Sequence, residues 1–169
     1  PDMRSHRKIG DIGYRKVQSL QDSYRLLRRS LPQYLYYDPV FGDIFSEVPE
    51  SRVSLYFFPV RALESLKRRR DLDHVELKAL DFAELLRCNT HIPTGQIGIS
   101  GSIMLGLHTP RSDIDLLIYG EDACRRVYKA LQRLIQGESC SVRRYGEMDL
   151  RALYNSRDRD TRMTFTDFL

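Results

Sequence analysis

Apolar residues recur with helical spacing in several segments of the chain. The clearest pattern lies in residues 122–136, where basic side chains occupy the opposite face. Its apolar positions are Cys124, Val127, Tyr128, Leu131, Leu134 and Ile135. A stripe of this kind predicts an amphipathic helix that buries one face against a core. Residues 74–87 show similar spacing and predict a second helix.

Capping and breaking residues predict two more helices in the first half of the chain. Ser19 can cap a helix that runs to Leu31, and Pro32 then ends it. Pro59 suits the first turn of another helix, which continues towards the basic residues Arg68, Arg69 and Arg70.

Three segments of the first half lack this spacing. Residues 1–18 are basic and contain two glycines, so we expect a flexible or loosely docked arm. Residues 34–42 combine aromatic residues with turn formers, which favours irregular structure packed across the main core. Residues 51–58 predict an extended segment.

The pattern changes after residue 96, where short apolar runs alternate with helical segments. Residues 97–99 and 113–119 predict buried strands, and residues 140–145 predict a further strand. The helical segments expected here are residues 102–107, 122–136, 148–154 and 164–169.

This order of elements predicts an α/β (α+β) fold for the second half, preceded by a mostly helical first half. We expect a basic arm over residues 1–18, a mainly helical region over residues 19–92 and the chemical core over residues 93–169. Because the chain stops inside a predicted helix, we also expect this core to be incomplete at its C-terminus.

Composition narrows the class of protein. With 41% apolar and 30% charged residues, the sequence predicts a soluble globular protein. The start is polar, and no apolar run approaches the ~20 residues that cross a bilayer, so no membrane partner is expected. Three widely spaced cysteines (Cys88, Cys124 and Cys140) fit a reducing, cytoplasmic compartment. The net charge of +4 permits phosphate-bearing ligands.

Two carboxylates mark the chemically informative segment. Asp113 and Asp115 lie two residues apart on a predicted strand, so their side chains point to the same face. Neighbouring carboxylates repel, and a cation, protonation of one group or solvent relieves that repulsion. Oxygen ligands at the start of a strand suit Mg²⁺, which also accepts phosphate oxygens.

A second element of the segment precedes these carboxylates. Gly101 leaves the backbone open, and Ser102 offers a hydroxyl and an N–H at a predicted helix start. Such a helix start can bind an anion. His108 and Arg111 in the connecting loop could reach a phosphate, although a solvated loop explains them equally well. Together, the two elements suggest a metal–polyphosphate ligand.

The segment resembles the signature of nucleotidyltransferases of the DNA polymerase beta superfamily. Gly101-Ser102, Gly106 and Ser112-Asp113-Ile114-Asp115 match that signature in order and spacing. The likeness is greatest to small prokaryotic-type members, in which a serine commonly precedes the first aspartate. The first ninety residues also resemble those of predicted archaeal nucleotidyltransferases with an added N-terminal region.

The resemblance implies a mixed sheet flanked by helices and a specific division of roles. Gly101, Ser102 and Ser112 would bind the nucleotide, and Asp113 and Asp115 would be the catalytic metal ligands. The cofactor would be Mg²⁺, with Mn²⁺ as an alternative. The reaction would transfer a nucleoside monophosphate from a nucleoside triphosphate to an acceptor hydroxyl, with RNA one candidate acceptor.

Such enzymes need a third carboxylate, and its position in this chain is open. Asp149 has the right local pattern but lies in a segment that looks helical, and the acid could instead lie beyond Leu169. Two alternatives follow: a non-catalytic nucleotide-binding protein, or an RNA-interacting protein that keeps the fold. Residues 68–70 and the tyrosines of residues 34–37 could contact RNA, although a solvated helix end and packing explain them better. The sequence does not determine the oligomeric state.

Overall fold

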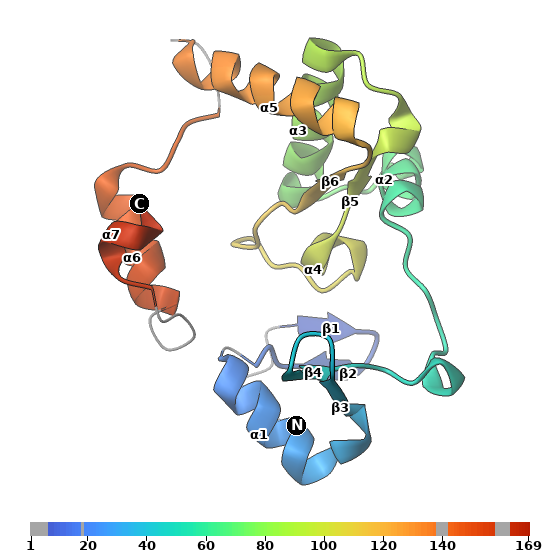
Figure 1. The fold of residues 1–169 in the computed structure, drawn as a ribbon. Coiled ribbons are helices and arrows are strands. Elements are labelled where there is room, and N and C mark those ends of the chain that lie inside the picture. The colour runs from blue at the N-terminus through green and yellow to red at the C-terminus, as the bar shows by residue number, and fades with distance from the viewer. Residues whose placement is uncertain (1–6, 18, 138–141, 158–162) are drawn as a thin grey trace. The chain divides into compact units, whose positions relative to one another are not determined.

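The computed structural model describes residues 7–17, 19–137, 142–157 and 163–169 (Figure 1). The chain divides into two compact units, which are described separately. One unit comprises Pro1–Arg15 and Phe57–Arg143, and the other comprises Lys16–Tyr56 and Arg144–Leu169. Helices and strands alternate along residues 97–136, which confirms the α/β class.

A pair of antiparallel strands forms the centre of the first unit. β5 (Ile97–Ile99) pairs with β6 (Leu116–Ile118), so that Ile99 lies opposite Leu116. One backbone hydrogen bond beyond each end extends the ladder, from Ser100 N to Asp115 O (2.8 Å) and from Tyr119 N to Gln96 O (2.9 Å). The strand predicted for residues 113–119 is therefore shorter than expected, and Asp113 and Asp115 precede it.

Two long helices, α3 (His74–Thr90) and α5 (Glu121–Gln136), lie side by side in this unit (Figure 1). Alanines occupy their buried faces and allow close approach: Ala79 and Ala83 on α3, Ala123 and Ala130 on α5. The predicted helix over residues 122–136 is confirmed, but part of its predicted apolar face is wrong. Cys124 is exposed and Tyr128 is 65% exposed, because the buried face is centred on the alanines and Val127.

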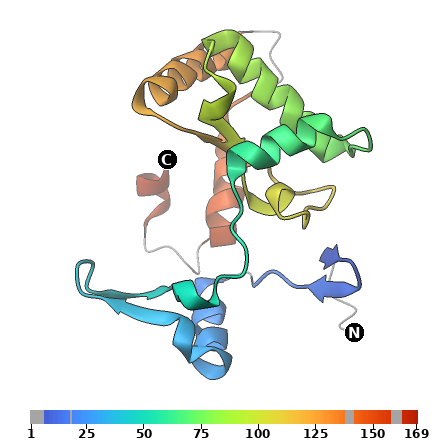
Figure 2. The same ribbon diagram turned by 90° about the vertical axis from the view of Figure 1, so that its right-hand side faces the viewer.

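Helix α2 (Pro59–Arg68) packs directly on β5, as Figure 2 shows within this unit. Leu63 and Leu66 are its buried residues. Gly98 makes the contact close: a Cβ there would lie 2.6 Å from the Pro59 carbonyl carbon and 2.7 Å from Val60 N. The core combines these elements. Its buried residues are Leu63, Leu66, Val75, Ala79, Ala83, Leu86, Ile92, Ile97, Ile99, Ile103, Ala123 and Val127.

The predicted turn of helix after β5 is also present. A 3-10 turn (Thr94–Gln96) leads into β5, and α4 (Gly101–Met104) follows it as a single turn. Residues 105–115 then connect α4 to β6. Among the described helices, none has both the length and the apolar character needed to cross a bilayer.

The N-terminal segments contain hairpins that the sequence pattern did not indicate. In the basic arm, β1 (Arg7–Ile9) pairs with β2 (Ile12–Tyr14). Helix α1 (Leu20–Ser30) begins as predicted, with the Ser19 side chain accepting from Asp22 N at 3.0 Å. A 3-10 turn (Pro32–Tyr34) ends it.

The irregular structure predicted for residues 34–42 is wrong. β3 (Leu35–Asp38) and β4 (Asp43–Ser46) form a hairpin, because Asp38 closes the turn. Its Oδ1 accepts from Val40 N at 2.7 Å, and its carbonyl accepts from Gly42 N at 2.8 Å. Within its own unit the tip of the hairpin is exposed, at 86% for Val40 and 74% for Phe41.

The remaining segments partly match their predictions. A 3-10 turn (Glu50–Arg52) begins the segment expected to be extended. The strand predicted for residues 140–145 is wrong where it can be checked, because the described residues 142–145 form no strand, and residues 140 and 141 lie outside the described ranges. The two C-terminal helical predictions are confirmed by α6 (Glu147–Arg157) and α7 (Phe165–Phe168).

Candidate active site

Asp113 and Asp115 lie at the entry to β6 with their carboxylates exposed. Burial alternates along this segment, since Ile114 and Leu116 between and after them are half-buried against the core. The two aspartates therefore share the exposed face, as period-two geometry requires. Within the part of the chain that the structure describes, neither carboxylate has a hydrogen bond or an ion pair. In the described ranges, no basic side chain forms an ion pair with either carboxylate that would offset their mutual repulsion.

Gly101 brings the other half of the motif against Asp115. Its φ of +62° is in the left-handed region, which favours glycine. A Cβ at Gly101 would overlap Asp115 Oδ2 and lie 3.0 Å from Asp115 Cγ. The neighbouring Ser100 fixes this contact, because its N–H and its hydroxyl both donate to Asp115 O, at 2.8 and 3.3 Å. The fold thus juxtaposes the glycine–serine turn and the second aspartate.

The start of α4 presents donors beside this contact. The first N–H groups of a helix have no intrahelical partner, and in α4 they belong to Gly101, Ser102 and Ile103. The Ser102 hydroxyl is half-buried and has no hydrogen-bond partner among the described residues. Because α4 has four residues, its dipole is slight, and an anion here would be held by individual N–H and O–H donors.

Ser112 has a different environment from the other predicted site residues. Its hydroxyl accepts from Thr109 N at 2.9 Å and lies 3.3 Å from Thr109 Oγ1, which closes the turn before Asp113. The half-buried Ser112 and Ile114 line a cavity of about 890 Å³, which Lys78 and Phe82 of α3 also line. The predicted contact of Ser112 with a nucleotide stays a prediction.

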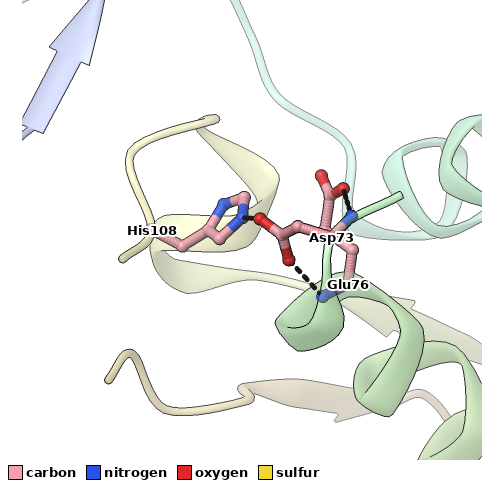
Figure 3. Close-up of side chains that lie close together, drawn as sticks. All are labelled: Asp73, Glu76 and His108. Atoms are coloured by element: carbon pink, nitrogen blue, oxygen red, sulfur yellow. Dashed lines mark hydrogen bonds and ion pairs between the residues drawn. The ribbon is translucent and has the colours of Figure 1, made fainter. Parts of the chain in front are cut away.

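A second polar cluster joins the loop after α4 to the first turn of α3 (Figure 3). Asp73 caps α3: its Oδ1 accepts from Val75 N and Glu76 N, and Glu76 Oε2 accepts from Asp73 N at 3.1 Å. His108 Nε2 lies 2.6 Å from Asp73 Oδ2. The sequence pattern did not reveal this cluster, although the spacing of Asp73 and Glu76 is that of a capping box. His108 was expected to reach a phosphate or solvent, and no local pattern indicated its contact with Asp73.

Local contacts explain the cluster without a metal ion. One ligand atom from each of Asp73, Glu76 and His108 lies within 4.8 Å of the others, so the three could in principle hold a cation. However, Glu76 Oε1 already pairs with Arg69 Nη1 at 2.6 Å, and the other oxygens cap the helix or meet His108. The backbone N–H of Glu76, followed by the His108 imidazole, lowers the pKa of the Asp73 carboxyl. Each charge in the cluster thus has a partner.

The ion pair of Arg69 with Glu76 predicts an asymmetry in stability. The Glu76 side chain is 6% exposed and that of Arg69 is 42% exposed, so removing the arginine leaves a buried carboxylate without its cation. We expect Arg69→Met to lower the free energy of unfolding by about 2 kcal/mol, and Glu76→Gln, which keeps the oxygen that accepts from Asp73 N, by about 1 kcal/mol. Urea denaturation measures both. Equal losses, or a double variant less stable than Arg69→Met, would contradict the argument.

Asp149 lies in the first turn of α6, and its Oδ2 accepts from Gly146 N at 3.0 Å. Its segment is therefore helical, as the sequence indicated.

Cys88 and Cys124 are free and exposed, whereas Cys140 lies outside the described residues. The Cys88 thiol donates to Glu84 Oε1, which raises the pKa of the thiol.

Comparison with known proteins identifies the part of the chain that carries the site. An uncharacterised protein of Methanocaldococcus jannaschii is 27% identical over 164 residues, which is 96% of this chain and 47% of that protein. The chain therefore spans about half the length of this relative. No solved structure matches the chain. A family model described as a nucleotidyltransferase domain matches residues 84–163, which include the glycine–serine turn and both aspartates. Over residues 84–163 the chain is therefore similar to the nucleotidyltransferase domain family.

Proposed function

We propose that this protein transfers a nucleoside monophosphate from a nucleoside triphosphate to an acceptor hydroxyl, with Mg²⁺ as cofactor and Mn²⁺ as an alternative. One observation carries the proposal: the Asp115 carboxylate lies against Gly101, at the start of α4, and shares an exposed face with Asp113. This arrangement brings one hard oxygen donor close to the N–H groups of a helix start, with a second donor two residues away on the same exposed face. The family match supports the general reaction class.

The donors present fit a divalent cation. Both carboxylates are exposed and have no cationic partner among the described residues. Carboxylate oxygens are preferred ligands of Mg²⁺, which keeps several waters and accepts phosphate oxygens in the remaining positions. When bound, such an ion neutralises charge on the phosphates and on the oxygen atoms of the reaction. Asp113 and Asp115 are the residues that would hold it.

The chain's own groups would position the triphosphate. Three hydrogen-bond donors are available at the start of α4: the N–H groups of Gly101 and Ser102 and the Ser102 hydroxyl. The absence of a side chain at Gly101 leaves room for Asp115. In the reaction, the acceptor oxygen bonds to the α-phosphorus while the bond to pyrophosphate breaks. The hydroxyl proton passes to a base. Rate enhancement would come mainly from orientation and charge stabilisation.

The test is calorimetric titration of the four ribonucleoside triphosphates, with Mg²⁺ and with a chelator. We expect binding that requires Mg²⁺. Asp113→Asn and Asp115→Asn should each weaken it about 30-fold, because each removes a charged oxygen ligand. Asp122→Asn, an exposed aspartate in the first turn of α5, is the matched control and should bind as the wild type does. Unchanged affinity in both site variants would refute the proposed metal site.

A non-catalytic nucleotide-binding role is the second candidate. It is favoured by one observation: in the described part of the chain, β6 has no neighbour besides β5, so no third acid stands on an adjoining strand. The positions proposed for the third acid are then Asp149 on α6 and an acid beyond Leu169. Release of pyrophosphate in the presence of RNA acceptors separates the two candidates. Turnover that Asp149→Asn abolishes supports the enzyme, and nucleotide binding without turnover supports the binding protein.

A further inference from the structure

We propose that His108 is a positioning residue of the nucleotide site. Residues 105–112 form the loop between the glycine–serine turn and the two aspartates. His108 fastens this loop to the first turn of α3 through Asp73 (Figure 3). This inference rests on the proposed function for the identity of the ligand. The fastening itself rests on the contacts of the loop.

Hydrogen bonds within the loop set its shape. Leu107 N donates to Ser102 O at 2.8 Å, and Ser112 N donates to Thr109 O at 2.9 Å. These bonds join the loop to itself and to α4. They would persist if the loop moved as a unit away from α3.

His108 provides the contact from this loop to another helix. Its Nε2 lies 2.6 Å from Asp73 Oδ2, across a separation of 35 residues in the sequence. The His108 side chain is 11% exposed, whereas Pro110 and Arg111 in the same loop are exposed. The imidazole is thus shielded beside the exposed tip of the loop, as expected for a side chain that anchors it.

Asp73 is a fixed partner although its side chain is 51% exposed. Its Oδ1 accepts two backbone N–H groups, from Val75 at 2.8 Å and from Glu76 at 3.0 Å. Glu76 holds the Asp73 backbone in return and is itself paired with Arg69. The carboxylate therefore keeps one orientation and presents Oδ2 to His108.

The remaining ring nitrogen shows which tautomer this contact selects. In the neutral tautomer that donates from Nε2 to the carboxylate, Nδ1 carries no proton, and this atom is buried without a hydrogen-bond partner among the described residues. A buried nitrogen without a partner is unfavourable. Because Nδ1 contributes no hydrogen bond, the ring is held by the contact of Nε2 with Asp73 and by burial. Glutamine, whose amide nitrogen reaches about as far as Nε2, should replace the donor.

The consequence for binding follows from a change in populations. If the loop detaches from α3 in a fraction of molecules, the spacing between Ser102 and the aspartates is no longer fixed in that fraction. The apparent dissociation constant then rises in inverse proportion to the competent fraction. His108 would act in this way without touching the nucleotide.

The experiment compares His108→Leu, His108→Gln, Asp73→Ser and the double variant His108→Leu/Asp73→Ser. Serine still caps α3 but is too short to reach His108, so it removes the contact and keeps the helix cap. We expect His108→Leu and Asp73→Ser each to weaken binding of Mg²⁺–ATP and Mg²⁺–CTP about tenfold, with thermal midpoints close to the wild type. His108→Gln should restore affinity to within about threefold, and the double variant should bind as the weaker single variant does.

Hydrogen exchange of the nucleotide-free proteins tests the fastening separately. Amides of residues 105–112 should exchange faster in His108→Leu and Asp73→Ser, while those of α3 stay protected. Unchanged exchange overturns the proposal, and so does faster exchange with unchanged affinity. If the wild type binds neither nucleotide, the proposed function fails, and exchange alone still supports or overturns the fastening. Should His108→Leu not fold, Asp73→Ser, altered at a half-exposed side chain, decides the result.

Discussion

Gly101→Ala is expected to weaken metal-dependent nucleotide binding strongly. The added Cβ would overlap Asp115 Oδ2, and it would lie 3.0 Å from Cγ and 3.3 Å from Cβ of the same side chain. Asp115 cannot yield freely, because its backbone carbonyl accepts two hydrogen bonds from Ser100. Its carboxylate must therefore rotate away from α4. We expect affinity for Mg²⁺–nucleotide to fall about 30-fold, as for Asp115→Asn, which corresponds to roughly 2 kcal/mol.

Gly106→Ala is the control that separates this overlap from backbone strain. Gly106 has a φ of +63°, close to the +62° of Gly101, so alanine meets the same conformational penalty of about 1 kcal/mol at both sites. A Cβ at Gly106, however, meets nothing within 4 Å. Gly106→Ala should lose stability in urea denaturation and keep most of its affinity in calorimetry. If both variants lose affinity equally, strain in the loop, and not the contact with Asp115, explains the effect.

The elements of the site follow from local patterns in the sequence. Two isoleucines on either side of Gly98 mark β5, and Ser102 and the apolar residues after it indicate the turn of α4. The spacing to Asp113 and Asp115 predicts that the two ends of the motif belong to one site. The sequence pattern overestimated the length of the second strand. The last hydrogen bond of the ladder joins Ser100 N to Asp115 O, so the two aspartates lie just before β6.

Features that depend on tertiary contacts could not be predicted from the sequence. The bond between His108 and Asp73 joins residues 35 apart and has no periodic signature. The orientation of α5 was misjudged for a related reason. Apolar spacing weights large residues such as Tyr128, but close packing of α3 on α5 selects alanine, so Ala123 and Ala130 are 0% and 1% exposed.

The hairpin of β3 and β4 could have been predicted from the residues of its turn. Aromatic residues there suggested packing in a core, yet the turn formers Asp38 and Gly42 bracket a hairpin loop. Tyr36 and Tyr37 remain about half exposed, at 52% and 59%. Turn chemistry was the better guide than side-chain hydrophobicity in this segment.

Gly98→Val is expected to destabilise the first unit strongly. Valine favours a strand, and by β-propensity alone the substitution would stabilise the protein by up to about 1 kcal/mol. Packing predicts the opposite sign. The Cβ would lie 2.6 Å from the Pro59 carbonyl carbon and 2.7 Å from Val60 N, and these backbone atoms cannot move unless α2 shifts as a whole.

We therefore expect Gly98→Val to lower the free energy of unfolding by about 3 kcal/mol or more in urea denaturation. Gly95→Val is the control, since a Cβ at Gly95 meets nothing within 4 Å. It should change stability by less than about 1 kcal/mol. Gly98→Ala should lie between the two, because it adds the clashing Cβ without the branch. A gain in stability for Gly98→Val would mean that α2 does not pack closely on β5. The positions of Ser100 and Asp115 would then depend on the pairing of β5 with β6 alone.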